Sequence, residues 1–273
     1  EEINGLYHRM VAQFPSKLLF PLIPSPRSKI KSADVHIMYQ AVSCLLPELC
    51  MSAACSESKE LQKFFEVNNI FRAVYQNSFQ HVLFLETASV DLNAMDSNGA
   101  TPLHHAVHLG FFDIAESLIK HGAHLDTQRQ DGCTPLHTAV VGSQKDEVDL
   151  LLANGAVLDM QNAAGDSAAH IAVRTSQITF LQTFIQHKCS LHLQNGLGWS
   201  VMHEAVALES LEMLDMLVEA GADLDLQSIP LGETPLHLAV AKENDDVVAL
   251  LIESGADLDK QDAKLQCPLH YVV

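Results

Sequence analysis

The stretch Thr101-Pro102-Leu103-His104 recurs along the chain at a nearly constant interval, and this recurrence decides the fold. Related tetrapeptides begin at residues 134, 167, 200, 234 and 267, and read Thr-Pro-Leu-His, Ser-Ala-Ala-His, Ser-Val-Met-His, Thr-Pro-Leu-His and Cys-Pro-Leu-His. The successive intervals are 33, 33, 33, 34 and 33 residues. A fixed period of roughly 20 to 50 residues is typical of a solenoid, in which each unit packs only on its neighbours.

Each repeat has the pattern of two short helices. Thr101 is a suitable N-cap, and Pro102 in the first helical turn loses no hydrogen bond, because its missing N–H would have no partner there. Apolar residues at helical spacing then predict a second helix around Ile114 and Leu118. Gly122 is placed to end that helix in the left-handed conformation. The sequence therefore predicts an all-α stack of helix–turn–helix units.

The repeat 167–199 departs from this pattern. Its neighbours end the second helix with Gly155 or Gly221, but Lys188 stands at the corresponding place. We expect this helix end to be weaker than the others by about 1 kcal/mol. The same repeat lacks the Thr-Pro opening, so we expect any internal fraying near residues 165–200. The one-residue insertion that makes a single interval 34 lies within residues 227–232, at an expected hairpin tip.

The whole unit resembles the ankyrin repeat. The resemblance rests on the Thr-Pro-Leu-His-x-Ala opening, the second apolar helix, and a Gly-Ala-x-Leu-Asp segment that leads into a hairpin, and it covers about residues 68–273. It implies an ankyrin-repeat solenoid with projecting β-hairpin loops, in a family of binding modules and not of catalysts. The expected repeats are 68–100, 101–133, 134–166, 167–199, 200–233, 234–266 and a partial 267–273.

The residues before this array are harder to assign. Residues 1–31 contain four prolines, which disfavour regular structure, and form either a linker or an extension that packs on the repeats or binds a second partner. Residues 32–67 predict a helical capping segment, which is interpreted as a degenerate repeat. Leu46-Pro47-Glu48-Leu49 alternatively resembles the opening of an F-box. Because the chain begins with Glu1 and ends inside a repeat, we expect a fragment of a longer protein.

Composition limits the classes of partner. The formal net charge is −18, and residues 1–31 carry +3, so the rest of the chain carries −21. A strongly acidic body does not suit nucleic acid or an anionic membrane, whose phosphates attract stripes of Lys and Arg. It suits a protein partner that is basic or neutral. No segment is long and apolar enough to predict membrane insertion, and we expect a monomer or part of a larger chain.

The six cysteines are scattered and predict free thiols in a reducing compartment, hence a cytoplasmic or nuclear protein. The fifteen histidines invite a metal hypothesis, but His104, His137, His170, His203 and His237 share one repeat position and cannot converge on one ion. In the ankyrin family this imidazole joins adjacent repeats. Acid pairs such as Asp146-Glu147 and Asp245-Asp246 begin second helices, where the helix dipole favours them. No catalytic motif is present, so we expect no enzyme activity and no cofactor.

The remaining candidate for a functional site is the surface of the repeats. In the ankyrin architecture the concave groove is lined by the residue before the capping Thr or Ser, by the hairpin-tip residues before it, and by the residues one and four after the repeated histidine. The candidate partner-binding residues are Trp199, Glu204, Glu233, His105, His108, Ile171, Arg174, Leu238 and Asp166. Trp199, the only tryptophan, has two interpretations: a hot spot for a partner, or a side chain that folds back over the Leu197-Gly198 turn.

Three functions follow as hypotheses. The first is a non-catalytic protein-interaction scaffold that holds a partner, such as a basic peptide, in the groove. The second is a regulatory or targeting segment of a larger enzyme or channel. The third is a ubiquitin-ligase substrate adaptor, which depends on the F-box-like tetrapeptide alone.

Overall fold

The computed structural model describes residues 70–80, 82–83 and 91–271. The expected extension 1–31, the capping segment 32–67 and the F-box-like tetrapeptide lie outside these ranges.

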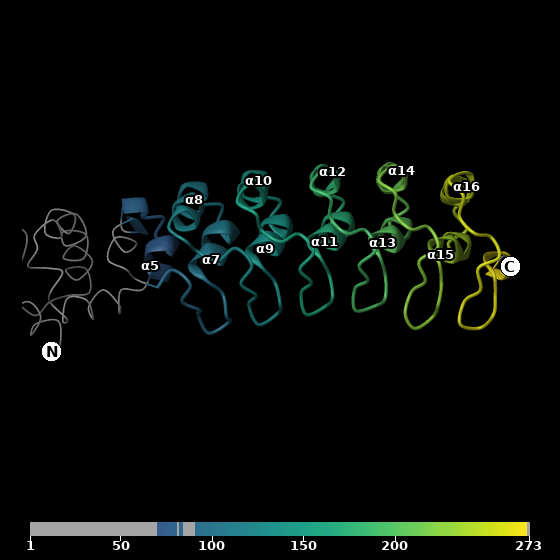
Figure 1. Ribbon diagram of the computed structural model, residues 1–273, viewed down its shortest axis with the longest axis horizontal. Helices are drawn as coiled ribbons and strands as arrows, with labels where there is room; N and C mark the ends of the chain where they lie inside the picture. The colour runs from purple at the N-terminus through teal and green to yellow at the C-terminus, as the bar shows by residue number, and fades with distance from the viewer. Residues whose placement is uncertain (1–69, 81, 84–90, 272–273) are drawn as a thin grey trace, which may run out of the picture. The chain divides into compact units, whose positions relative to one another are not determined.

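The first helices of the repeats form one row, and each contacts the first helix of the next repeat (Figure 1). They are α5 (Ile70–Tyr75), α7 (Pro102–His108), α9 (Pro135–Val141), α11 (Ala168–Arg174), α13 (Val201–Ala207), α15 (Pro235–Ala241) and the 3-10 helix η1 (Pro268–Tyr271). The first helices α7, α9, α11, α13 and α15 each have a completely buried alanine at the same repeat position: Ala106, Ala139, Ala172, Ala205 and Ala239. These small side chains allow neighbouring helices to approach closely.

The second helices form another row, drawn above the first in Figure 1. They are α8 (Phe112–Lys120), α10 (Lys145–Ala153), α12 (Ile178–Gln186), α14 (Leu211–Glu219) and α16 (Asp245–Glu253). Each packs on the first helix of its own repeat through residues at helical spacing, such as Ile114 and Leu118, which are fully buried. Acid pairs in the first turns of α10 and α16 confirm the expected dipole arrangement. The all-α solenoid predicted from the period is therefore confirmed.

The helix caps also follow the sequence. Thr101, Thr134 and Thr234 cap their helices, and each accepts a hydrogen bond from the backbone N–H of the histidine three residues later. Ser167 and Ser200 occupy the same position with the same extended backbone, although proline is missing from those repeats. There the serine N–H still donates to Nδ1 of the histidine three residues later, at 3.3 Å for Ser167 and 3.2 Å for Ser200.

The ends of the second helices confirm the role of the repeated glycine. Gly122, Gly155, Gly221 and Gly255 have φ between +79° and +94°, and Lys188 has φ +60° at the same place. Lys188 is therefore forced into a conformation that costs an L-residue about 1 kcal/mol or more. The ends of the first helices were not anticipated: Ser143, Ser176, Glu209 and Glu243 all have φ near +56°.

The connections between repeats are hairpin-shaped, but no β-strand occurs in the described ranges. Each hairpin is closed by two short-range backbone bonds, for example Asn162 N–H to the Asp166 carbonyl at 2.9 Å, which is too few for a ladder. The hairpin of repeat 200–233 is one residue longer than the others. Its Ser228 N–H bonds to the carbonyl of Glu233, five residues later, whereas the Asn162 N–H bonds to a carbonyl four residues later. The insertion therefore lies at the tip, as predicted.

A glutamine ladder joins successive hairpins, and the sequence reasoning missed it. Gln161 Nε2 donates to the Gly165 carbonyl at 2.6 Å and to the Gln194 carbonyl of the next repeat at 2.8 Å. Gln128, Gln194 and Gln227 make the same pair of bonds in their repeats. Glutamine at residues 128, 161, 194, 227 and 261 was the available signal.

Candidate partner-binding surface

The repeated histidines hold the array together. His104 accepts from the Thr101 N–H at Nδ1 (3.1 Å) and donates from Nε2 to the Cys133 carbonyl in the next repeat (3.1 Å). Nδ1 must be unprotonated to accept, so the ring is the neutral tautomer with its proton on Nε2. His137, His170, His203 and His237 make equivalent bonds. The structural role expected for this position is confirmed.

Burial makes four of these rings hard to protonate. It lowers the pKa of His104 from 6.5 to about 4, and it also lowers the pKa of His137, His170 and His203. A second proton, on Nδ1, would break the hydrogen bond that the N–H of the capping residue donates to that nitrogen. The array is therefore assembled around neutral imidazoles.

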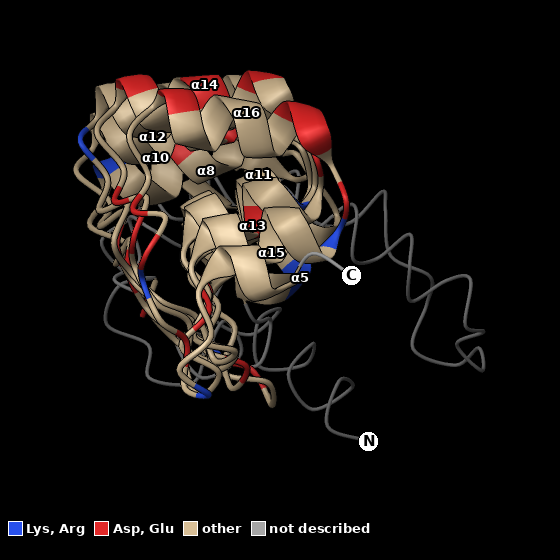
Figure 2. Cartoon of the chain, turned by 90° about the vertical axis from the view of Figure 1, so that its right-hand side faces the viewer, with Lys and Arg blue, Asp and Glu red and all other residues tan. Residues whose placement is uncertain are grey.

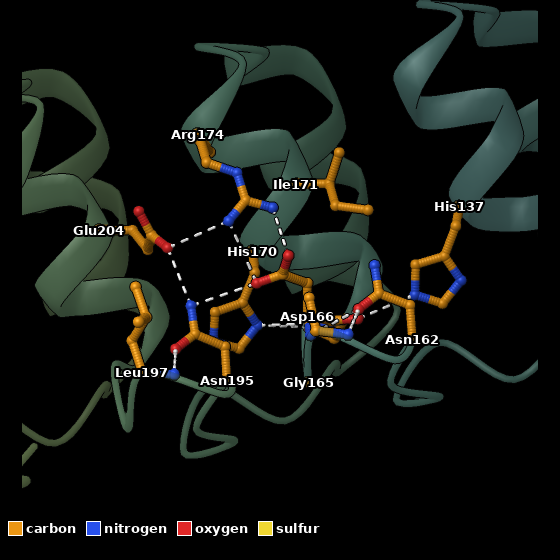
Figure 3. Close-up of polar contacts among 12 residues, drawn as sticks. His137, Asn162, Gly165, Asp166, His170, Ile171, Arg174, Asn195, Leu197 and Glu204 are labelled. Atoms are coloured by element: carbon orange, nitrogen blue, oxygen red, sulfur yellow. Dashed lines mark hydrogen bonds and ion pairs between the residues drawn. The ribbon is translucent and has the colours of Figure 1, made fainter. Parts of the chain in front are cut away.

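Three of the candidate residues converge in the middle of the array. Asp166, Arg174, Asn195 and Glu204, here called the central acidic cluster, come from three successive repeats (Figure 3). Arg174 pairs with Asp166 through both terminal nitrogens and also reaches Glu204 Oε1 at 3.5 Å. Asn195 Nδ2 donates to Glu204 at 3.0 Å and to Asp166 at 3.2 Å. One amide and one guanidinium thus hold two carboxylates together.

The charges in this cluster do not balance. Asp166 and Glu204 are buried, whereas the Arg174 side chain is 43% exposed. Burial raises the pKa of Glu204; Arg174 opposes this shift and the carboxylate of Asp166 adds to it. With both acids ionised, two negative charges face one positive charge. A further cation at this place would be electrostatically favourable.

The same positions form a polar cluster near the start of the described array. His105, one residue after the repeated histidine, bonds to Asp96 at 2.9 Å and to the Tyr75 hydroxyl at 2.9 Å. The Phe71 ring meets His105 edge-on at 5.5 Å between centroids. Both ring nitrogens of His105 are therefore hydrogen-bonded within the protein, whereas His108, three residues later, is exposed.

A third cluster lies at the other end. The Tyr271 hydroxyl donates to Asp262 at 2.8 Å and to Glu233 at 3.1 Å. Burial and the two carboxylates raise the pKa of this hydroxyl. Glu233 is half-buried and is the candidate residue that this cluster contains.

The two candidate aliphatic residues lie in different environments. Ile171 was expected on the surface but is only 5% exposed, because it packs inside the stack of first helices, so it offers little contact area. Leu238, at the same position two repeats later, is half-buried. An exposed apolar side chain between the polar clusters is instead Val141, at the position four residues after His137.

Trp199 is half-buried, which fits parts of both interpretations. Its ring lies nearly parallel to the ring of His203, with centroids 6.4 Å apart, and its carbonyl accepts from His170. Its backbone N–H is held by Asn195, which belongs to the central acidic cluster. The Trp199 backbone is therefore fixed beside that cluster, and the residue, whose indole stacks on His203, is partly available to a partner.

Other chemistry is not assembled in the part of the chain that the structure describes. No group of three or more His, Cys, Asp and Glu side chains there could hold a metal ion. Cys133, Cys189 and Cys267 are free and half-buried, and burial raises the pKa of Cys189 to about 11, which makes it a poor nucleophile at neutral pH. None of the described helices is long and apolar enough to cross a bilayer.

Comparison with known proteins agrees with this geometry. The model of the family described as ankyrin repeats (3 copies) matches residues 70–162, 142–228 and 169–262. The ankyrin repeat domain of Bcl-3, described as a unique member of the IkappaB protein family, is 25% identical, with a TM-score of 0.69 over 74% of this chain and 92% of that one. The ankyrin repeat domain of human ASB11 is also 25% identical, with a TM-score of 0.61 over 75% of this chain and 91% of that one. No curated protein matches by sequence. The chain belongs to the ankyrin-repeat family.

Proposed function

We propose that this protein is a non-catalytic interaction module of the cytoplasm or nucleus, which binds a partner protein through the surface formed by its first helices and hairpins. Ankyrin repeats are generally protein–protein interaction modules. The partner presents a Lys or Arg side chain to the central acidic cluster. The observation that carries this proposal is the pair of buried carboxylates that share the single guanidinium of Arg174.

The charge distribution supports a basic partner. Acidic residues are spread over the helices and hairpins, and basic residues are sparse (Figure 2). Of the few cations, Lys120 pairs with Glu116, Lys145 with Asp149, and Lys242 with Glu209. Such a surface attracts a basic partner from a distance, and the attraction weakens as salt is added.

Trp199 supports the same location. A partly exposed indole beside charged groups is typical of residues that dominate binding energy. Trp199→Ala should weaken partner binding by about 2 kcal/mol or more. Because the indole also stacks on His203, a loss of stability must be measured separately.

The test uses the full 273-residue chain as bait in a native lysate, with quantitative mass spectrometry of what is retained. Wild type is compared with Asp166→Asn/Glu204→Gln, which removes the charges but keeps the shapes. The matched control is Asp215→Asn/Glu253→Gln, which removes two exposed acids from α14 and α16. Melting temperatures of all three are recorded.

We expect a partner that the wild type and the control retain and that the cluster variant loses at unchanged stability. The purified partner should bind more weakly as salt rises. Equal recovery of the partner by the cluster variant would show that the binding surface lies elsewhere.

A further inference from the structure

The hairpin tips change in character along the array. The tips at 97–98 and 130–131 are Ser-Asn and Gln-Asp, and the tip at 163–164 is Ala-Ala. The last three tips contain Leu197, Ile229, Leu231 and Leu265, here called the tip strip. Their exposed fractions are 65%, 62%, 50% and 73%. Large apolar side chains at such exposure serve no purpose in the fold of the hairpins themselves.

Backbone contacts bring these tips side by side. The N–H of Ala263 donates to the Leu231 carbonyl at 2.9 Å, and the backbone of Ile229 lies directly against Gly198. In Figure 1 the same hairpins form a row at the edge opposite the second helices. The four side chains therefore belong to one surface. Clustered apolar side chains on a soluble protein mark an interaction site more often than isolated ones do.

The groups around the strip indicate what covers it. Glu233 follows the Ile229–Leu231 tip, and the central acidic cluster lies at the base of the hairpin that carries Leu197. Lys264 is the basic residue at these tips. A second copy of the chain would bring a net charge of −18 against an equal charge, which opposes self-association through this surface.

We propose that the tip strip binds the aliphatic face of a basic amphipathic peptide segment, whose Lys or Arg side chains reach Glu233 and the central acidic cluster. The inference deepens the function proposed above and rests on it for the basic part of the partner. It adds that the apolar part of the binding free energy comes from the three C-terminal hairpins. The first three tips, which carry polar residues or alanine, contribute little.

The experiment selects peptides from a random 16-residue library displayed on phage, with the full chain as target. Parallel selections use wild type, the tip variant Leu197→Ser/Ile229→Ser/Leu231→Ser/Leu265→Ser, and the cluster variant Asp166→Asn/Glu204→Gln. The matched control Val157→Ser/Leu258→Ser removes two exposed aliphatic side chains from loops that follow the second helices. Enriched peptides are synthesised, and their affinities for all four proteins are measured by fluorescence anisotropy.

Wild type and the control should enrich peptides that combine aliphatic residues with Lys or Arg. The tip variant should bind these peptides at least tenfold more weakly at unchanged melting temperature. If affinity falls for the cluster variant but not for the tip variant, the tip inference is wrong and the acidic site stands. If the affinity falls for the tip variant alone, the strip binds apolar peptides without the acidic site, and the proposed function loses its basis. Failure to enrich this class on wild type overturns the tip inference.

Sedimentation of the wild type and the tip variant tests whether a second copy of the chain, instead of a peptide, occupies the tip strip. Concentration-dependent dimers of the wild type that are absent from the tip variant would assign the strip to a second copy and would also overturn the inference.

Discussion

At the scale of single residues, backbone conformation is set by position in the repeat and not by residue preference. Lys188 adopts φ +60° because the next hairpin must start where Gly122 or Gly221 would place it. The fold imposes the same positive φ on a lysine, whose Cβ disfavours that conformation. The cost is local, and it can be removed without changing any packed side chain.

Lys188→Gly should raise the free energy of unfolding by about 1 kcal/mol, because glycine enters the left-handed region without the Cβ penalty. Urea denaturation measures the change. The reciprocal variant Gly221→Lys should lose a similar amount, since a Cβ at Gly221 meets nothing within 4 Å and only the backbone strain is added. No gain from Lys188→Gly would mean that the lysine side chain contributes contacts that offset the strain.

The repeated histidines predict a pH dependence. Burial lowers the pKa of His104, His137, His170 and His203 below 6.5, so between 6.5 and the folded value, about 4 for His104, the unfolded chain binds more protons than the folded chain. Stability therefore falls as the pH falls through this window, by up to about 1.4 kcal/mol per pH unit for each histidine. The raised pKa of Glu204 acts in the opposite sense.

His137→Gln isolates one such histidine. Although the variant is less stable at every pH, its free energy of unfolding should decline less steeply than that of wild type between pH 6.5 and 5. Urea titrations at several pH values give both slopes. Identical slopes would show that His137 does not contribute to the acid sensitivity.

At the scale of elements, the hairpins depend on close backbone approach between repeats. A Cβ on Gly165 would lie 2.5 Å from the backbone nitrogen of Gly196, whereas a Cβ on Gly155 would meet nothing within 4 Å. Both residues have positive φ. The pair therefore separates the cost of a left-handed alanine from the cost of a collision.

Gly155→Ala should destabilise by about 1 kcal/mol, from backbone strain alone. Gly165→Ala should cost about 1–3 kcal/mol more, because the added methyl group forces two hairpins apart. Amide exchange of Gly196, whose N–H bonds to the Ala164 carbonyl at 2.7 Å, should accelerate only in the second variant. Equal losses in both variants would show that the hairpins can separate freely.

At the scale of the whole array, stability is a sum of repeats and their interfaces, so one weak interface can uncouple the two sides. The repeat 167–199 has the strained Lys188 end, and fraying near residues 165–200 stays a prediction. The structure adds an opposing contribution: the central acidic cluster ties this repeat to the next through Arg174, Asn195 and Glu204.

Arg174→Ala should destabilise the chain by about 1–2 kcal/mol, since it leaves two buried carboxylates without a cation; the partial exposure of Arg174 keeps the loss below that of a fully buried pair. Adding Glu204→Gln should restore part of the loss, because one of the two carboxylates becomes neutral. Amide exchange should report faster opening within residues 165–200 in the single variant. Additive effects of the two substitutions would show that Arg174 and Glu204 are not coupled.

The sequence by itself determined the period, the helix pairs, the caps, the bonding position of the repeated histidines and the tip insertion. These features depend on residues close together in the chain or on strict recurrence, as with Thr101, Pro102 and His104. Because the groove-lining positions recur in each repeat, the sequence also predicted Asp166, Arg174 and Glu204 as candidate partner-binding residues.

Only the tertiary structure decided what those candidates do. Ile171 and Leu238 share a repeat position, yet one is buried and the other half-buried, because burial depends on the side chains of the adjacent repeats. Asn195 was not a candidate, although its amide joins the two carboxylates of the central acidic cluster. The apolar tip strip also required the structure, since residues about 33 apart become neighbours only when consecutive hairpins stack.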